Sequence, residues 1–344
     1  MAQFSLEWDL LFLKSREEMD RIGALYKDKI NQALSQISDE DSQLSQAAKS
    51  ALAAGGKRLR PILALLCCEA ISGNYEDSIP AAISYELAHT ASLVQDDIVD
   101  DSKLRHNKPT AYSKYGTVRA IMVSDYLIFA IFSELSKYGS SNISRERFGQ
   151  LLSYFSNAAT TAAKGEFADV LLATKGGVTR EEYLDMIGFK TAALFGASTA
   201  TGGIIGGASK RTVASLYKFG YNFGLSFQIM DDILDIVGNP NQMGKPVLKD
   251  IQNNASNIVV IDAISKMPAS GKKLISSLRW KSSIPESSAQ RIITMFEETG
   301  SLEYAIGLAA RYNAICRICL RGLPSSSARE KLDRLARALI AGPI

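Results

Sequence analysis

The sequence predicts an all-α protein, because helical periodicity fills almost every long segment. Apolar residues recur there at spacings of three and four, and no alternating strand pattern of useful length occurs. The segments that read as helices are 16–36, 78–101, 111–137, 144–174, 179–200 and 209–237. No break between them has the length or composition of a domain linker. We therefore predict a single helical-bundle domain over 1–344, with 1–40 as N-terminal helices and 267–344 as C-terminal helices.

Two helix starts carry the pattern of a capping box, in which a hydroxyl and a Glu three residues later satisfy free N–H groups. They are Thr179 with Glu182 and Ser327 with Glu330.

Composition excludes several classes of protein. The chain has 344 residues, 46% of them hydrophobic, and a formal net charge of +3 without a dense basic block. This balance argues against nucleic acid as a partner. The N-terminus lacks the basic segment and apolar core of a signal peptide, and no apolar stretch approaches about 18 residues, so we expect a cytoplasmic protein without a membrane span.

The four cysteines are interpreted as buried, reduced thiols. They come as an adjacent pair, Cys67 and Cys68, and as Cys316 and Cys319 three positions apart. A structural zinc site needs four ligands, and the chain has two histidines in all.

Four carboxylates gather at the end of the segment 78–101. On a helix, Asp96 stacks over Asp100, and Asp97 over Asp101. Like charges in that register repel, and burial beside apolar neighbours makes them more costly. Magnesium, which prefers oxygen ligands and also binds substrate phosphate, would remove both problems. A merely solvated acidic face explains this cluster, taken alone, about equally well.

A second cluster with the same D-D-x-x-D spacing makes the metal interpretation stronger. Asp231, Asp232 and Asp235 again lie within an apolar helical pattern. Two aspartate-rich helices that face each other across a central cavity would hold several divalent ions and a polyphosphate.

A basic segment precedes the first aspartate helix. Gly55 and Gly56 free the backbone there, and Lys57, Arg58 and Arg60 supply three cations in four positions. An ordinary basic turn before a helix is the simpler interpretation. Together with the aspartates, the segment indicates a second anionic group, separate from the metal-bound one.

These motifs, with R-H-N-K-P-T at 105–110, Lys190-Thr191 and F-Q-x-x-D-D-x-x-D at 227–235, resemble those of trans-isoprenyl diphosphate synthases (polyprenyl synthetases). The resemblance runs from about residue 50 to the C-terminus. It implies the all-α fold of isoprenoid synthases, a homodimer, and a Mg²⁺-dependent prenyltransferase that joins isopentenyl diphosphate to an allylic diphosphate.

The resemblance also implies roles for individual residues. Those that would bind magnesium are Asp96, Asp97, Asp100, Asp231, Asp232 and Asp235. Those that would bind isopentenyl diphosphate are Lys57, Arg60, His89 and His106. Those that would surround the allylic diphosphate are Arg105, Lys190, Thr191, Gln228 and Lys245. Those directly involved in catalysis would be Asp96, Asp97, Asp100, Lys190 and Asp231.

Three of these residues have simpler interpretations. His89 fits a buried core histidine, although its offset of seven from Asp96 places both on one helix face. Lys190 fits a solvated helix residue, and Thr191 a hydroxyl inside a helix.

The chemistry suits these residue types. Departure of an allylic diphosphate leaves a carbocation, so the main demand is to stabilise charge on the leaving group, which metals and cations do in place. No serine, cysteine or histidine nucleophile is needed.

The chain departs from the family at four positions. His106 replaces the second of two arginines, and its charge depends on pH near neutrality. Asn107 and Leu248 stand where glycine is common. Ala255 replaces a lysine that binds diphosphate, a loss for which Lys249 could compensate in part.

Product length depends on the residues that precede the first aspartates. In the family, a bulky aromatic four or five positions before the first aspartate closes a short pocket. Here Ser92 and Ala91 occupy these positions, Ala88 lies one turn further, and the first large residue is Tyr85. We predict a product longer than fifteen carbons, with geranylgeranyl diphosphate first and a longer polyprenyl diphosphate second.

Three other functions stay open. A terpene cyclase or head-to-head synthase would also bind metal ions through aspartates, but it needs no separate pocket for isopentenyl diphosphate. A weakly active binding subunit of a heteromeric synthase would fit His106, Leu248 and Ala255. A purely structural bundle would leave the polar motifs without a role.

Overall fold

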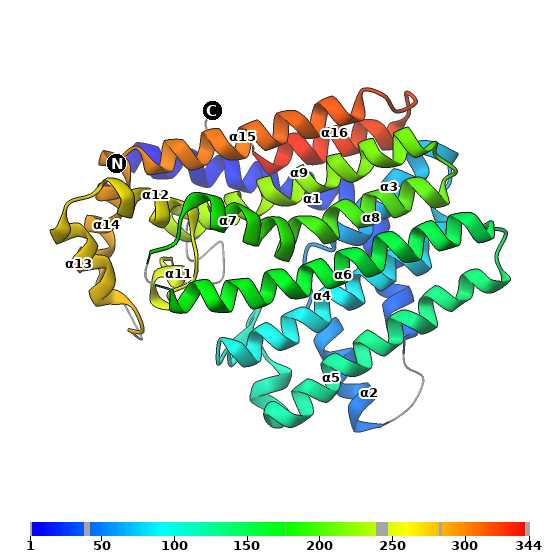
Figure 1. The fold of residues 1–344 in the computed structure, drawn as a ribbon, viewed down its shortest axis with the longest axis horizontal. Coiled ribbons are helices and arrows are strands. Elements are labelled where there is room, and N and C mark those ends of the chain that lie inside the picture. Colours follow the sequence, from blue (N-terminus) through cyan, green and yellow to red (C-terminus); the bar gives the residue numbers. More distant parts are fainter. Residues whose placement is uncertain (1, 38–41, 176, 239–246, 282–283, 341–344) are drawn as a thin grey trace.

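The fold is all-α, as the sequence predicts (Figure 1). The computed structural model describes residues 2–37, 42–175, 177–238, 247–281 and 284–340, with side chains from residue 14. The helices of the N-terminal half are α1 (Ala2–Ser35), α2 (Gln43–Leu52), α3 (Leu59–Ser72), α4 (Ile79–Val99), α5 (Ala111–Ser136) and α6 (Arg145–Thr174). Those of the C-terminal half are α7 (Arg180–Ile187), α8 (Ala193–Ile205), α9 (Lys210–Val237), α11 (Lys249–Gln252), α12 (Ile258–Lys266), α13 (Ala269–Leu278), α14 (Glu286–Glu298), α15 (Ser301–Leu320) and α16 (Ser327–Leu339).

Short elements complete the fold. Two 3₁₀ turns cover Glu76–Ser78 and Lys137–Ser140, and a π-helical turn covers Gly188–Ala192. In the described residues, strand structure is limited to a hairpin of β1 (Leu104–Arg105) and β2 (Lys108–Pro109).

The predicted helices are confirmed with several differences. Helix α1 begins well before residue 16, and α5 is kinked at Gly116, whose φ of 79° and ψ of 168° are not helical. The segment 179–200 is not one helix, because the π-helical turn separates α7 from α8. The segment 78–101 ends sooner than predicted: α4 stops at Val99, and Asp101 has a φ of 50°, outside the helix. Asp101 pairs with Lys103 at the surface, so its predicted stacking under Asp97 is wrong.

One of the two predicted caps is correct. Both hydrogen bonds of the capping box between Thr179 and Glu182 are present at the start of α7. At α16 the cap is Ser326, whose side chain accepts from the N–H of Arg329, whereas Ser327 lies inside the helix.

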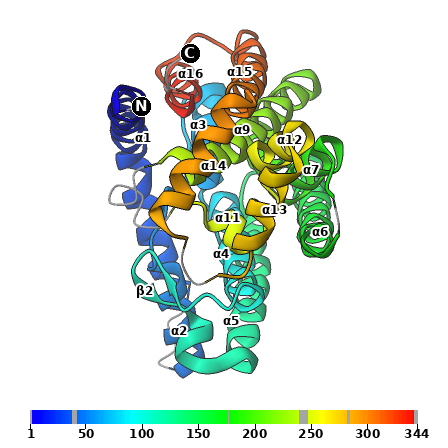
Figure 2. The same ribbon diagram turned by 90° about the vertical axis from the view of Figure 1, so that its left-hand side faces the viewer.

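Helix α8 lies at the centre of the bundle (Figures 1 and 2). All its residues except the last are buried, and it packs against α3, α4, α6 and α9. Its small residues permit this, because a Cβ at Gly202 would clash with the carbonyl of Ala64 on α3. A second apolar core joins the C-terminal half of α9 to α12, α14 and α15.

Helices α1 and α16 lie side by side (Figures 1 and 2). The Ser15 hydroxyl donates to the carbonyl of Ala338, and Arg334 Nε donates to Glu18 at 2.6 Å. Because α1 packs on both α16 and α3, we infer that the N- and C-terminal helices belong to the same domain as the aspartate helices.

Among the described residues, no helix combines the length and apolar character that crossing a bilayer requires.

The crossing of α8 and α9 generates a stability prediction. A Cβ at Gly220 would clash with the Thr199 hydroxyl and the Phe195 carbonyl. Gly220→Ala should therefore lower the free energy of unfolding by about 1–3 kcal/mol. Gly307→Ala, at an open and exposed position of α15, is the control and should raise it by about 0.5–1 kcal/mol. Urea unfolding measures both, and equal effects would contradict the packing argument.

Candidate active site

A cavity of about 1730 Å³ opens between α4, α5, α6 and α9. Asp96, Asp97 and Asp100 line it from α4 and its C-cap, and Asp231 lines it from α9. The two aspartate helices therefore face one cavity, as the sequence predicts. Most other predicted site residues line the same cavity; they are Lys57, Arg60, Ala88, His89, Ala91, Ser92, Arg105, His106, Lys190, Thr191 and Gln228.

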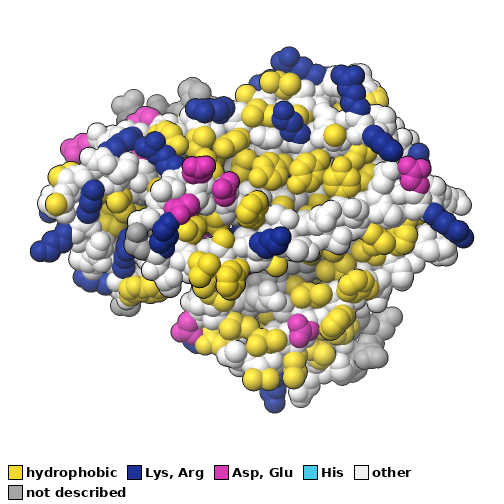
Figure 3. Space-filling model, in the orientation of Figure 1, with side chains coloured by type: hydrophobic (Ala, Val, Ile, Leu, Met, Phe, Trp, Pro, Cys, Tyr) yellow, Lys and Arg dark blue, Asp and Glu magenta, His cyan; other side chains and the backbone are white. Residues whose placement is uncertain are grey.

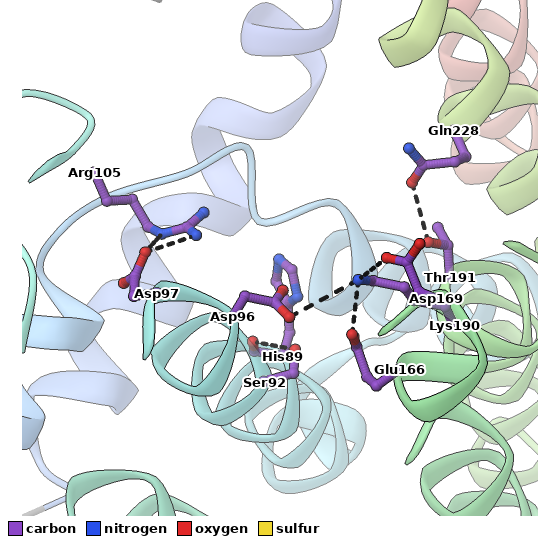
Figure 4. A network of polar contacts seen from close by, with 10 residues as sticks. All are labelled: His89, Ser92, Asp96, Asp97, Arg105, Glu166, Asp169, Lys190, Thr191 and Gln228. Atoms are coloured by element: carbon purple, nitrogen blue, oxygen red, sulfur yellow. Dashed lines mark hydrogen bonds and ion pairs between the residues drawn. The ribbon is translucent and has the colours of Figure 1, made fainter. Parts of the chain in front are cut away.

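Lys190 stands among three carboxylates that come from two helices (Figure 4). Its Nζ lies 2.7 Å from Glu166, 2.8 Å from Asp169 and 3.8 Å from Asp96. The π-helical turn that carries Lys190 packs directly on α6 at Gly165, where a Cβ would clash with the Lys190 backbone. This close approach places the ammonium group between α4 and α6.

No sequence motif singles out Glu166 and Asp169. They lie three apart on one face of α6, just after the glycine that contacts Lys190. Their spacing is common in solvated helices, so the tertiary packing alone identifies them as part of the site.

Carboxylate crowding shifts the pKa values in this cluster. Burial raises the pKa of both Asp100 and Glu166, and the negative charge of Asp96 raises them further. The pKa of Glu166 reaches about 7. Burial by itself would lower the pKa of Lys190, but its carboxylate neighbours outweigh burial and raise it. The cluster thus carries more negative charge than one ammonium group balances.

This donor set fits divalent cations. Its oxygens belong to Asp96 and Asp100 on one side and Glu166 and Asp169 on the other, which are the hard ligands that magnesium prefers. Among the described residues, however, no three such groups converge closely enough to hold an ion by themselves. An ion here would therefore need further oxygen ligands, such as water or a substrate phosphate.

Two aspartates of the second motif are not among the residues that line the cavity. Asp232 is buried and accepts from the hydroxyl of Tyr183 at 2.5 Å and the N–H of Ile258 at 2.8 Å. Asp235 is buried as well and accepts the N–H groups of Lys249 and Asp250 at 3.2 and 3.1 Å. These carboxylates connect α9 to α7, α11 and α12.

A hydrogen-bonded chain joins the cavity wall to Asp232. Thr191 Oγ1 donates to Gln228 Oε1 at 3.1 Å, and Gln228 Nε2 donates to Asp232 Oδ1 at 3.3 Å. Thr191 and Gln228 are thereby held in fixed orientations at the edge of the cavity.

The basic segment before α3 lines the same cavity. Gly55 and Gly56 have φ values of 99° and 137°, as expected for a backbone that needs glycine. Lys57 lies over the ring of Phe227, 5.3 Å from its centroid. Arg58, by contrast, is buried and bound by Glu86 and the Leu52 carbonyl, so it serves the structure of the loop.

Arg60 gives the clearest indication that this part of the cavity binds an anion. It is buried, its guanidinium lies 4.3 Å from the ring centroid of Phe195, and its Nε has no hydrogen-bond partner among the described residues. Burial lowers its pKa to about 10, which leaves it charged at neutral pH. A buried cation with a free donor in a cavity wall is costly unless an anion completes its hydrogen bonds.

His89 lies between these cations and the aspartates. Burial first, and then Arg60 and Arg105, lower its pKa well below the ordinary value. The imidazole is therefore neutral at pH 7 and can donate one hydrogen bond without adding charge.

The hairpin β1–β2 brings further cations to the cavity. Arg105 Nη2 pairs with Asp97 at 2.9 Å, which fixes its guanidinium beside the first aspartate motif. His106 and Asn107 form the turn with φ values of 49° and 61°. Asn tolerates this left-handed conformation better than most residues, which explains how it replaces glycine here.

The departures near α11 have different outcomes. Leu248 has a φ of 60° and is fully buried, so the glycine-like conformation is kept and its strain is offset by burial of the side chain. Lys249 lines the cavity, whereas Ala255 is exposed on the chain that follows α11. Lys245 lies outside the described residues.

The cavity continues from the aspartates along α4 past Ser92, Ala91 and Ala88. Tyr85 does not line it: the ring is fully buried, and its hydroxyl shares a hydrogen bond with Thr201 at 2.8 Å. The expectation that Tyr85 ends the pocket is therefore wrong in detail. The lining residue at that depth is Phe155 of α6, whose ring centroid lies 5.0 Å from that of Tyr85.

The four cysteines are free and buried, as predicted. Burial raises the pKa of each thiol, most strongly at Cys67 and Cys316, so none is a thiolate at neutral pH.

Matches to known proteins cover most of the chain. Residues 41–295 match the family model described as polyprenyl synthetase. The chain is 35% identical to a geranylgeranyl diphosphate synthase of Saccharolobus solfataricus, over 86% of this chain and 90% of the relative. It is 34% identical to a short chain isoprenyl diphosphate synthase of Methanothermobacter thermautotrophicus, over 90% and 93%. A crystal structure of geranylgeranyl pyrophosphate synthetase from Pyrococcus horikoshii superposes with a TM-score of 0.87 at 32% identity, over 95% and 99% of the two chains.

The buried Asp232 generates a pH prediction. Burial raises its pKa from 3.8 to about 7 against the hydrogen bonds that lower it. Between these values the folded protein holds a proton that the unfolded chain has lost, so the free energy of unfolding should fall as pH rises through this window. In urea titrations with a chelator present, Asp232→Asn should show a shallower fall than the unaltered protein. Asp28→Asn on the exposed face of α1 is the control, and parallel curves for Asp232→Asn would refute the assignment.

Proposed function

Because this chain belongs to the polyprenyl synthetase family and is a prenyltransferase, we propose that it extends an allylic diphosphate with isopentenyl diphosphate to geranylgeranyl diphosphate. The observation that carries the proposal is one cavity that contains two groups of charged side chains and an apolar branch. A carboxylate cluster, the cations Lys57 and Arg60, and an apolar stretch of α4 all line it, and Arg60 Nε has no hydrogen-bond partner among the described residues.

The two groups of charged side chains would bind the two substrate diphosphates. Arg60 and Lys57 would bind isopentenyl diphosphate through charge-assisted hydrogen bonds, with the neutral His89 as an additional donor. Arg105 and Lys190 would bind the allylic diphosphate beside the first aspartate motif. Magnesium bound between the carboxylates and that diphosphate would stabilise the negative charge of the leaving group.

The metal proposal narrows to the carboxylates that line the cavity. Asp96, Asp97, Asp100 and Asp231 remain candidates, together with Glu166 and Asp169 near Lys190. Asp232 and Asp235 already accept hydrogen bonds from α7, α11 and α12, which favours a supporting role for them.

The residues of the site would act by position and charge. With both diphosphates anchored, the isopentenyl double bond would lie near C1 of the allylic group, and the new C–C bond would form as the C1–O bond breaks. The electron pair of that bond leaves with the diphosphate, which would also take the proton lost from the isopentenyl unit. The apolar wall of Phe195, Leu194 and Phe227 would keep water away from the allylic carbocation that develops at C1.

The size of the apolar branch supports a product longer than fifteen carbons. Ala91 and Ala88 leave room beside α4, and Phe155 of α6 is one of the large side chains that line the cavity. Relatives named geranylgeranyl diphosphate synthase make twenty carbons our first choice.

The test uses purified protein with magnesium, labelled isopentenyl diphosphate, and allylic primers of five, ten and fifteen carbons. We expect products that end at twenty carbons, and loss of turnover with chelator. An end point beyond twenty carbons would make the protein a longer-chain synthase. Folded protein that incorporates no label with any primer would instead point to a binding subunit of a heteromeric synthase.

The apolar branch generates a prediction about product length. Ala91→Phe should shorten the main product to fifteen carbons or fewer, because the ring would fill the branch beside α4. Phe155→Ala should act in the opposite direction and extend it. Chromatography of the dephosphorylated products measures both, and unchanged lengths in both variants would exclude this branch as the site of the growing chain.

We further propose a homodimer through α5 and α6. Exposed apolar residues form a stripe along α5, at helical spacing, and continue on α6, where Figure 3 shows hydrophobic side chains gathered. They are Val118, Ile121, Met122, Phe129 and Phe132 on α5, and Leu152, Phe167, Val170 and Leu171 on α6. Phe132 and Leu152 also line the cavity, so a second copy on this face would close the apolar branch to water.

A cytoplasmic location stays a prediction of the sequence.

The stripe predicts a change of mass in solution. Ile121→Lys combined with Phe129→Lys should convert a dimer to a monomer in light scattering, because two buried charges would oppose association. Leu25→Lys, at an equally exposed apolar position on α1, is the control and should leave the mass unchanged. A double variant that keeps the dimer mass would place the interface elsewhere.

A further inference from the structure

Helix α1 forms one wall of the cavity. Arg16, Met19, Asp20 and Lys27 line it, at the spacings that place residues on one face of a helix. The family match begins at residue 41, so it assigns no role to this helix.

Several contacts fix the position of α1 against the bundle. Met19 and Tyr26 are buried in the main core, and the Tyr26 hydroxyl donates to Glu69 of α3 at 2.6 Å. Glu18, on another face, is paired with Arg334 of α16. The packing of the domain therefore fixes the stretch of α1 that carries Arg16, whose exposed side chain lines the cavity.

In the described part of α1, this wall carries two basic side chains, Arg16 and Lys27, and one acidic side chain, Asp20. Lys27 pairs with Asp20 at 2.5 Å. Lys57 and His106 line the same cavity from the loop before α3 and from the hairpin turn.

His106 leaves a shortage of permanent charge at this place. Burial lowers the pKa of His106, and the charges of Arg105 and then Arg16 lower it further. The imidazole is thus neutral at pH 7, and Arg16 is close enough for its charge to be felt there. A diphosphate carries more negative charge than Lys57 and Arg60 alone balance.

We propose that Arg16 binds the diphosphate of isopentenyl diphosphate and supplies the cation that histidine at position 106 does not provide. Its guanidinium offers a planar set of donors, stays charged at any working pH, and reaches the anion from a third structural element. The inference rests on the proposed isopentenyl site at Lys57 and Arg60.

The test compares steady-state kinetics of Arg16→Gln with those of Lys14→Gln. Residues two apart on a helix point to different sides, and Lys14 is exposed and does not line the cavity. Arg16→Gln should raise KM for isopentenyl diphosphate by about tenfold, or about 1.4 kcal/mol. The KM for the allylic primer and kcat should change by less than about twofold, as expected when one uniform binding contact is lost. Lys14→Gln should match the unaltered enzyme.

A compensating substitution separates binding from a structural role. His106→Arg should restore the isopentenyl KM of Arg16→Gln, because it returns a permanent cation to the same place, whereas damage to α1 would not be repaired from the hairpin. Arg16→Lys should lose less affinity than Arg16→Gln. An unchanged KM in Arg16→Gln, or equal increases for both substrates without rescue, would overturn the proposal. If Lys57→Gln also left the isopentenyl KM unchanged, the proposed isopentenyl site itself would be wrong.

Discussion

The site depends on the repulsion among carboxylates that the fold forces together. Asp96 and Asp100 from α4 meet Glu166 and Asp169 from α6 in a partly buried space, where burial and mutual charge raise the pKa values of Asp100 and Glu166. Such a cluster is stable only with positive charge in its midst. Lys190 provides part of that charge, and the proposed magnesium ions would provide the rest.

The geometry of the chain around Lys190 follows from this requirement. An uninterrupted helix over 179–200 would give the ammonium group a different direction, whereas the π-helical turn inserts an extra residue per turn just where Lys190 and Thr191 face the cavity. Gly165 lets the turn approach α6 closely enough for the ion pairs to form. The local irregularity, the glycine and the carboxylates thus act as one unit.

The two aspartate motifs have the same residue spacing, but they differ in how many of their carboxylates line the cavity. In the first motif all three predicted carboxylates line the cavity, because α4 ends there and its last turn is open. In the second motif, α9 is covered on most sides, so Asp231 alone of the three reaches the cavity. Asp232 and Asp235 instead accept N–H groups from the starts of α12 and α11. Their oxygens thereby satisfy N–H groups that have no partner within the first turn of a helix.

The sequence by itself determined the all-α class, the extent of several long helices and the meeting of two aspartate helices at one cavity, because these depend on local periodicity and on side-chain spacing along single helices. The resemblance of its motifs to a known family also placed Lys57, Arg60, His89, Arg105, Lys190 and Thr191 at that cavity. The tertiary structure alone decided that Glu166 and Asp169 surround Lys190, that Arg16 lines the cavity, that Asp232 and Asp235 are buried, and that Phe155 rather than Tyr85 lines the apolar branch. These outcomes depend on which face of one helix packs against another, and the periodicity of a single helix leaves that choice open because every exposed face has similar spacing.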